Sequence, residues 1–417
     1  MRRTSSTLRL TDLLPELSVS EADRDMLRDL AGTLVTHNLE QSNTLLVTKK
    51  GYPDSNTGQW KEMRRKDGLR IYRERPKATR GGAPFTPSLL LLGTVDGTVE
   101  DVMYGVVATT DAALKIKSTC VSDGMLDTKM LRELAEPSRE DPFRHVGIKW
   151  KLYDGRDYVS LDAMGVVRSS NGERVGYNLS HSVAFPDLPE FTKHGVLRGN
   201  MSVCSLYRQK TLTSVECYVR GFFDFPSKNE MLNNVALQAL ATQWLSFGRT
   251  VECGCMKKLA WKLRRNSLDG RSSDGSSAST CSSYDSSSSP RPSPPPSIRP
   301  GACARCSHSF GFLGTSRATC RSCMQSVCTR CTVKKLVCAI APDSRTVLEK
   351  KRSFCRECIK DILMSDTLAI AREELAFYQG EESVDGFQCT PERWKDLKDR
   401  RDAESVPIPQ RTESCYV

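Results

Sequence analysis

Eight cysteines near the C-terminus form four Cys-x-x-Cys pairs between positions 303 and 358. Two intervening residues allow both thiolates of a pair to face one tetrahedral metal ion. Eight thiolates suit two closed, four-coordinate zinc sites, and a segment this short and polar needs such bonds in order to fold. We therefore predict two bound Zn²⁺ ions, with the ligands Cys303, Cys306, Cys320, Cys323, Cys328, Cys331, Cys355 and Cys358.

Two other interpretations of these cysteines are weaker. Free thiols in a flexible tail would not require the repeated spacing, and a redox function would require four active Cys-x-x-Cys pairs. Cys338 lies between the pairs without a partner at ligand spacing, so we predict a free, buried thiol. Cys253 and Cys255 flank a single glycine near the end of an expected helix, and we interpret them as structural thiols.

The elements before the cysteines indicate an α+β domain over residues 20–265. A helix is expected at Asp23–Gln41, from apolar residues spaced three to four apart, and a long amphipathic helix at 230–265. Runs rich in β-branched and aromatic residues predict seven strands between them. These strands are Gly68–Arg73, Ser88–Val95, His145–Leu152, Asp157–Ala163, Val175–Phe185, Asn200–Gln209 and Thr213–Asp224.

The remaining segments differ in composition. Residues 266–300 are dominated by serine and proline, can bury almost no apolar surface, and are predicted to be a disordered linker. We expect a flexible N-terminus at 1–19, the zinc module at 301–363, and a short helix followed by a flexible tail at 364–417.

Overall composition narrows the function classes. The net charge of +11 favours anionic partners, but charge alone does not choose between a membrane, an acidic protein and a nucleic acid. Nucleic acid is disfavoured because no patch interleaves aromatic and basic residues. No signal-peptide core, membrane span or catalytic motif is evident, so we expect a cytoplasmic protein that is not an enzyme.

The cysteine spacing, together with Phe310 four places after Cys306, resembles the FYVE zinc finger family over roughly residues 300–363. RING and PHD fingers usually place a histidine fourth or fifth among the ligands, where this chain has Cys323 and Cys328. The resemblance implies a cross-brace in which alternate pairs share an ion. One ion would bind Cys303, Cys306, Cys328 and Cys331, and the other would bind Cys320, Cys323, Cys355 and Cys358.

The lipid site of that family is only partly present. Members that bind phosphatidylinositol 3-phosphate carry the motif R-[RK]-H-H-C-R-x-C-G, and this chain has Ala318 and Thr319 in place of the histidines and Met324 in place of the glycine. Ser353 replaces a further family arginine. Because phosphate capture needs several converging donors, these losses predict weakened phosphoinositide binding.

Some membrane-binding features remain. By resemblance, the candidate lipid-binding residues are Arg317, Arg321, Phe312, Leu313, Lys351 and Arg352. Phe312 and Leu313 occupy the loop where the family inserts apolar side chains into bilayers, although they could instead pack over a zinc knuckle. The family's membrane role implies peripheral association with endosomal membranes, and Lys334, Lys335 and Arg330 would favour anionic lipid.

Residues 20–265 are similar to START lipid-transfer domains in the order of their elements. The segment Trp60–Tyr72 resembles the opening strand of that family, Arg156–Val159 its recurrent Arg-Asp strand, and 230–265 its closing helix. The resemblance implies a helix-grip fold whose curved sheet holds one apolar ligand, the alternative being a filled core that binds nothing. A START-like domain followed by a FYVE-like finger resembles a set of oomycete multi-domain proteins.

Three hypotheses follow. The first is a non-enzymatic adaptor that binds an apolar lipid in one domain and docks on an anionic membrane, a phosphoinositide or a protein with the other. The second is a protein-interaction scaffold whose finger has lost phosphoinositide binding. The third is a ubiquitin ligase that uses a cross-brace finger, which the all-cysteine ligand set disfavours.

Overall fold

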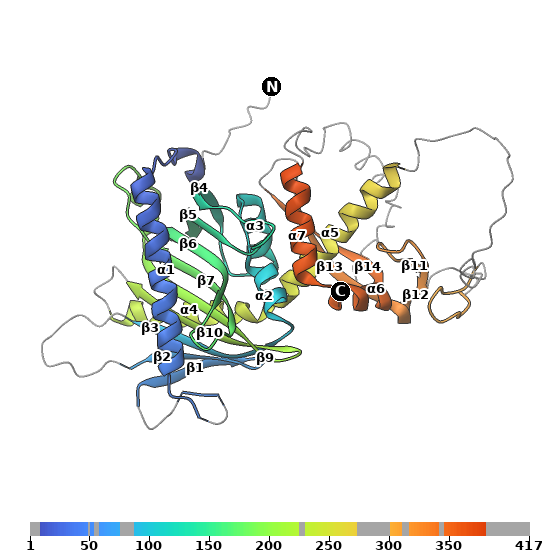
Figure 1. Ribbon diagram of the computed structural model, residues 1–417, viewed down its shortest axis with the longest axis horizontal. Coiled ribbons are helices and arrows are strands. Elements are labelled where there is room, and N and C mark those ends of the chain that lie inside the picture. The colour runs from blue at the N-terminus through green and yellow to red at the C-terminus, as the bar shows by residue number, and fades with distance from the viewer. Residues whose placement is uncertain are drawn as a thin grey trace, which may run out of the picture.

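The computed structural model describes residues 9–48, 51–53, 58–75, 87–224, 230–272, 301–310, 317–341 and 346–380 (Figure 1). Phe312 and Leu313 lie outside these residues, as do 273–300 and the tail after Gly380.

A large, almost entirely antiparallel sheet forms the first part of the molecule. Within the described residues it has ten strands in the order β1-β2-β3-β10-β9-β7-β6-β5-β4, with the short β8 pairing in parallel with β6. The strands are β1 (Trp60–Lys66), β2 (Leu69–Glu74), β3 (Ser88–Asp96), β4 (Asp127–Ala135), β5 (His145–Tyr153), β6 (Arg156–Arg168), β7 (Arg174–Ser182), β8 (Leu197–Arg198), β9 (Asn200–Thr211) and β10 (Ser214–Asp224).

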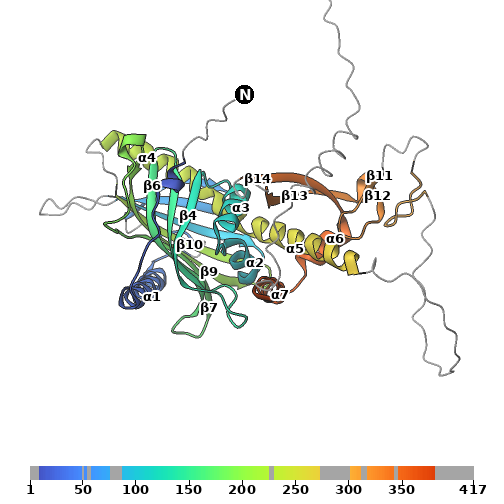
Figure 2. The same ribbon diagram turned by 90° about the horizontal axis from the view of Figure 1, so that it is seen from above.

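Helices pack on both faces of this sheet, so it has a core on each side. On one face, called the α1 face here, α1 lies over residues such as Trp150 and Leu161. On the other, the α5 face, α2, α4 and α5 lie over residues such as Tyr207 and Phe223 (Figure 2). The helices are η1 (Leu10–Leu13), α1 (Glu21–Thr44), α2 (Val99–Val106), α3 (Asp111–Val121), η3 (Thr192–His194), α4 (Glu230–Trp244), η4 (Leu245–Arg249) and α5 (Thr250–Ser272).

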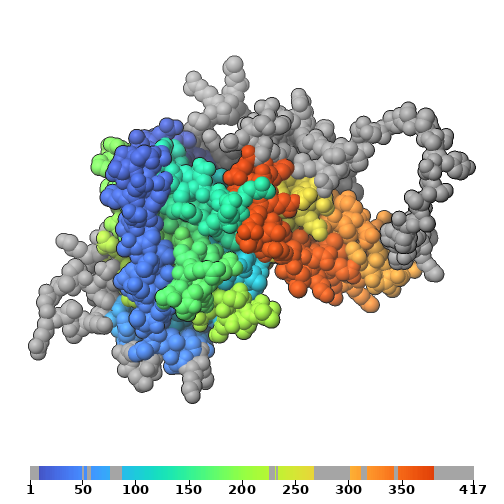
Figure 3. Space-filling view, viewed as in Figure 1, coloured from blue at the N-terminus to red at the C-terminus, as the bar shows by residue number. Residues whose placement is uncertain are grey.

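The cysteine-rich module consists of two small hairpins and a short helix, followed by a longer helix that returns to the first domain. Figure 3 shows this C-terminal part, in orange and red, in contact with the first domain, in blue to green. Its elements are β11 (Arg317–Thr319), β12 (Ser326–Cys328), η5 (Thr329–Cys331), β13 (Thr332–Ile340), β14 (Val347–Cys355), α6 (Arg356–Leu363) and α7 (Thr367–Gly380).

The predicted α+β class is confirmed, since the expected strands β2, β3, β5, β6, β7, β9 and β10 are all present. Most of β5 is buried on both faces of the sheet, although the strand alternates apolar and charged residues. Val146, Ile148 and Trp150 point to the α1 face, while Lys149 and Lys151 point to the α5 face. The sequence interpretation missed β4 and α3, whose apolar patterns are weak.

The flexible N-terminus predicted for residues 1–19 is wrong in its second half. Leu14, Leu17 and Val19 are buried in the core of the α1 face. The ammonium group of Lys129 also donates hydrogen bonds to the backbone oxygens of Thr11 and Leu14, at 3.2 and 2.8 Å. The segment is thus ordered because its apolar residues cover the edge of the sheet.

The single closing helix predicted for 230–265 is divided. A 3-10 turn, η4, separates α4 from α5, and the apolar side chain of Val235 on α4 is exposed. Helix α5 continues beyond the expected boundary at 266 to Ser272, and the Asn266 amide donates a 2.7 Å hydrogen bond to the backbone oxygen of Ser322. Contact with the cysteine-rich module therefore extends this helix into the predicted linker.

Candidate metal centres and the polar strip of the sheet

The eight cysteines lie in two groups of four, and within each group all sulfur atoms lie within 4.8 Å of one another. The pairs interleave along the chain as the cross-brace resemblance implied. The first group contains Cys303, Cys306, Cys328 and Cys331, and the second contains Cys320, Cys323, Cys355 and Cys358.

The spacing of the sulfur atoms fits a tetrahedral ion. Zinc–sulfur bonds of about 2.3 Å place the sulfurs of a tetrahedral site about 3.8 Å apart. The sulfurs of Cys306 and Cys328 are 3.6 Å apart, and those of Cys323 and Cys355 are 4.0 Å apart. Each group could therefore hold one ion of this size.

Backbone amides also point at the sulfurs. The amide of Cys328 donates to the sulfur of Cys303 at 3.2 Å, and the amide of Cys358 donates to that of Cys355 at 3.4 Å. The guanidinium of Arg305, in the first knuckle, reaches the sulfur of Cys323 at 3.5 Å, in the second group. Such donors stabilise thiolate charge and orient the ligands, and Arg305 couples the two groups.

The two knuckles end in the same strained turn. Ser307 follows Cys306 and Met324 follows Cys323, and each has a φ of 56° in the left-handed region. The amide of Met324 donates to the backbone oxygen of Cys320 at 2.9 Å, which closes the turn. Met324 is the position at which the FYVE motif has glycine, and glycine adopts this conformation without a steric penalty.

We expect Met324→Gly to raise the free energy of unfolding of the metal-bound chain by up to about 1 kcal/mol, because it removes left-handed strain. Met324 is 64% exposed, so little packing is lost. The control is Met364→Gly at another exposed methionine, whose backbone is right-handed (φ −89°), and it should destabilise slightly. Denaturant titration checks both, and a Met324→Gly protein no more stable than wild type would contradict the strain argument.

Helix α5 forms part of the core of the cysteine-rich module. Leu259 is buried against Phe354, Ile359 and the metal-ligand cysteines. Beside this contact, Cys120, Cys253 and Cys338 gather with Met256 in a second buried cluster. Cys338 is thus a free, buried thiol, as predicted, and burial raises its pKa to about 11. It joins the module to α3 and α5.

Helix α7 also attaches the cysteine-rich module to the first domain. Asp101 of α2 accepts hydrogen bonds from Lys258 of α5 at 2.7 Å and from Thr367 at the start of α7 at 2.6 Å. Burial would raise the pKa of Asp101, but these two bonds lower it overall. The Tyr104 hydroxyl donates to Glu374 at 2.6 Å. The module is therefore held to the first domain by buried polar contacts as well as by apolar ones.

Three basic residues lie around the β13–β14 pair of the module, where Arg321 is exposed and Lys335 and Arg352 are half-buried. The amide of Arg321 donates to the backbone oxygen of Ser353 at 2.9 Å, which places Arg321 beside β14. Arg352 lies directly across from Lys335 in the β13–β14 pair, and the charge of Arg321, after burial, lowers the pKa of Arg352. Within the described part of the chain, none of the three forms an ion pair. We name Arg321, Lys335 and Arg352 the cationic triad.

The other candidate lipid-binding residues are placed less favourably. Lys351 is exposed on β14, opposite Leu336. The Nε atom of Arg317, on β11, donates to the Ser326 hydroxyl at 3.0 Å, and its guanidinium lies 5.8 Å from the centre of the Phe310 ring. The sequence interpretation named Lys335 only as part of general basic surroundings, because its position opposite Arg352 depends on strand register.

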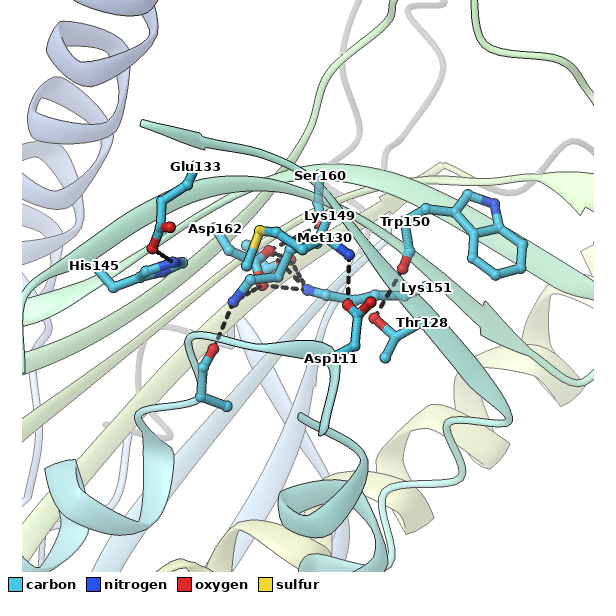
Figure 4. Close-up of polar contacts among 12 residues, drawn as sticks. Asp111, Thr128, Met130, Glu133, His145, Lys149, Trp150, Lys151, Ser160 and Asp162 are labelled. Atoms are coloured by element: carbon cyan, nitrogen blue, oxygen red, sulfur yellow. Dashed lines mark hydrogen bonds and ion pairs between the residues drawn. The ribbon is translucent and has the colours of Figure 1, made fainter. Parts of the chain in front are cut away.

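A polar strip crosses the α5 face on the neighbouring strands β5, β6 and β7 (Figure 4). Lys151 donates to Asp162 at 2.7 Å and to the Ser180 hydroxyl at 3.0 Å. Lys149 lies 3.7 Å from Asp162 and donates to the backbone oxygen of Ala108 at 2.9 Å. Both lysines and Asp162 are buried, so two cations share one carboxylate inside the protein.

The electrostatics of the strip follow from this imbalance. Burial lowers the pKa of Lys149, Asp162 opposes this shift, and Lys151 and Lys117 reinforce it, so that the net pKa is about 8. For Asp162, burial favours the neutral acid, but Lys151 and Lys149 outweigh it and its pKa falls well below the ordinary value. The sequence interpretation overlooked this strip, although lysines at alternate positions of an apolar strand were a visible signal.

Asp157, in the Arg-Asp segment of β6, has a structural role. It pairs with Arg198 at 2.9 Å and accepts a 2.7 Å hydrogen bond from the indole of Trp150. These contacts tie β8 to β5 and β6 and satisfy a fully buried carboxylate.

Among the comparisons with known proteins, only solved structures gave matches. No family model and no curated protein matches the chain. Similar solved structures include human StAR-related lipid transfer protein 5, at 14% identity and a TM-score of 0.39 over 55% of this chain and 98% of that one. Human STARD10 matches at 12% identity and 0.36 over 53% and 88%. A STAR-related lipid transfer protein fragment from Xanthomonas axonopodis matches at 12% and 0.33 over 46% and 97%.

None of the described helices combines the length and the apolar character required to cross a bilayer.

Proposed function

We propose that the protein is a zinc-dependent, non-enzymatic adaptor that docks on anionic membrane surfaces through its C-terminal module. The cationic triad is the observation that carries this proposal. Like charges directly opposite one another in a sheet are destabilising, as for Lys335 and Arg352, and Arg321 adds a further positive charge beside Arg352. A bound phosphate would relieve this repulsion, and arginine is well suited to phosphate.

Zinc is the metal that best suits the two cysteine groups. All eight candidate ligands are cysteines, the known sulfur distances fit a tetrahedral site, and four cysteines at each ion would leave no position open for a substrate. The ions would therefore be structural. They would hold β11, β14 and α6 together, and with them the cationic triad.

Vesicle flotation of the full chain tests membrane docking. Removing two of the three triad charges, in Arg321→Gln with Arg352→Gln, should weaken binding to phosphatidylserine vesicles by roughly 30-fold, at about 1 kcal/mol for each charge. The control pair is Arg64→Gln with Arg65→Gln on β1, which removes the same charge far from the module. Equal losses in the two pairs would show that only net charge matters and would refute a role for the triad.

Vesicles in which phosphatidylinositol 3-phosphate replaces phosphatidylserine at equal total charge test the finer specificity. Given Ala318 and Thr319, which are neutral where the FYVE motif has histidines, we expect at most a small preference for the phosphoinositide. The same substitutions favour the second candidate function, a protein-interaction scaffold. A wild-type chain that fails to float with any anionic vesicle would support the scaffold and exclude the membrane adaptor.

We further propose that the first domain holds an apolar ligand, which the START resemblance implies. The α5 face supports this proposal because it combines an apolar half, on β2, β3 and β10, with the polar strip. In addition, the buried hydroxyls of Ser205 and Tyr207, two residues apart on β9, lack a hydrogen-bond partner of ordinary geometry among the described residues. Native mass spectrometry should show the chain with two zinc ions and a co-purified lipid, and a chain that carries zinc but no added lipid mass would contradict this part.

A further inference from the structure

A groove lies on the opposite side of the sheet from the polar strip, between α1 and the α1 face. Its volume is about 470 Å³, within the range of roughly 300–1,000 Å³ typical of ligand pockets. The walls come from α1, β5, β6 and β7, so the groove is built from regular elements and not from loops alone. Its apolar lining residues are Ala31, Val35, Leu39, Val146, Ala163 and Val167.

Two glycines lie where side chains would change the shape of this groove. Gly32 lies in the middle of α1 and lines the groove, and a Cβ added there would meet no atom within 4 Å. Glycine inside a helix costs about 1 kcal/mol relative to alanine, and packing does not require it here. Across the groove, a Cβ on Gly165 would lie 2.9 Å from the hydroxyl oxygen of Tyr177, so glycine lets this ring lie along the floor.

The rim of the groove carries excess positive charge. Arg28, Arg144 and Arg168 line it, together with a single carboxylate, Glu40. Arg28 is already engaged, because it pairs with Asp25 and donates to the backbone oxygen of Leu134. Arg144 and Arg168 form no ion pair with any described residue, although Arg168 donates one hydrogen bond to the backbone oxygen of Gly172.

We propose that this groove binds a single-chain amphiphile with an anionic head group, of which a long-chain fatty acid is the simplest example. The acyl chain would lie along the apolar strip beneath α1, where each buried methylene contributes about 0.8 kcal/mol. The carboxylate would pair with Arg144 and Arg168, which supply charge-assisted hydrogen bonds. The site shares no residue with the polar strip or the cationic triad, so it is independent of the proposed function.

Photolabelling of the full chain with a diazirine-bearing palmitate locates the site directly. After irradiation and digestion, we expect saturable labelling of α1 and β6 peptides that contain Val35 or Val167, and competition by unlabelled palmitate. Label confined to peptides of the α5 face, such as those of β3 and β10, would place the lipid in the other core and overturn the proposal, as would labelling that does not saturate.

Matched variants distinguish the contribution of the groove's shape to palmitate binding from the contribution of its positive charge. Gly32→Phe should fill the groove and reduce labelling at least tenfold, whereas Gly32→Ala should keep the labelling and slightly raise the melting temperature. Arg144→Gln with Arg168→Gln should weaken palmitate binding about tenfold and leave binding of the uncharged hexadecanol analogue unchanged. Because both arginines are exposed, this variant remains informative even if Gly32→Phe fails to fold, and equal effects on acid and alcohol would refute the carboxylate contact.

Discussion

Removal of the metal is expected to unfold residues 301–363 while the ten-stranded sheet stays folded. The buried core of this module consists largely of ligand cysteines, with Phe354, Ile359 and Ile362 as its main buried apolar side chains. Structural zinc contributes on the order of 10–16 kcal/mol of apparent binding free energy in small modules, more than such a core supplies. Hydrogen exchange with and without a chelator should show β13, β14 and α6 losing protection while β5 and β6 keep it.

The cysteine variants provide a matched comparison for this experiment. Cys320→Ser removes one ligand and should mimic the chelator, whereas Cys338→Ser changes an equally buried thiol that is not a ligand and should cost only about 1–3 kcal/mol. Because Leu259 of α5 packs into the module, the end of α5 should also lose protection. Full protection of β13 and β14 in the metal-free chain would show that the module folds without an ion.

Replacing Asp162 with alanine is expected to destabilise the first domain by about 3–5 kcal/mol, because it leaves Lys149 and Lys151 buried without a carboxylate. Adding Lys149→Met should restore part of this loss, since one buried charge is then gone. The control is Glu100→Gln, which breaks the exposed pair with Arg174 and should cost less than about 1 kcal/mol. Urea titration measures all three, and an Asp162→Ala effect as small as that of Glu100→Gln would contradict the account.

The pH dependence of stability supplies a second check on the same lysines. The pKa of Lys149 is about 8 in the folded chain and has its ordinary value of 10.5 in the unfolded chain, so the unfolded chain binds more protons between these limits. The contribution of Lys149 to stability is therefore complete above pH 10.5 and is lost as the pH falls through 8. From pH 8 to pH 10.5, the unfolding free energy of wild type should therefore rise by about 3 kcal/mol relative to that of Lys149→Met.

Local sequence patterns were sufficient to predict the candidate metal ligands and seven of the strands. Cys-x-x-Cys spacing places two thiolates on one ion whatever surrounds them, so the eight candidate ligands could be read directly from the chain. Likewise, runs of β-branched and aromatic residues predicted seven of the strands to within a few residues, except that β6 runs five residues further, to Arg168. In both cases the signal lies within a short segment, where side-chain chemistry and backbone preference act together.

Other features depend on residues far apart in the chain. Arg352 is opposite Lys335 only because of the β13–β14 register, and Lys149 shares Asp162 with Lys151 only because β5 and β6 pair at that offset. The groove likewise requires Gly32 of α1 to lie over β6. Composition and spacing thus predicted the candidate metal ligands and the α+β class. Long-range packing determined the positions of the unpaired charges and of the groove, because burial and register are properties of the folded chain.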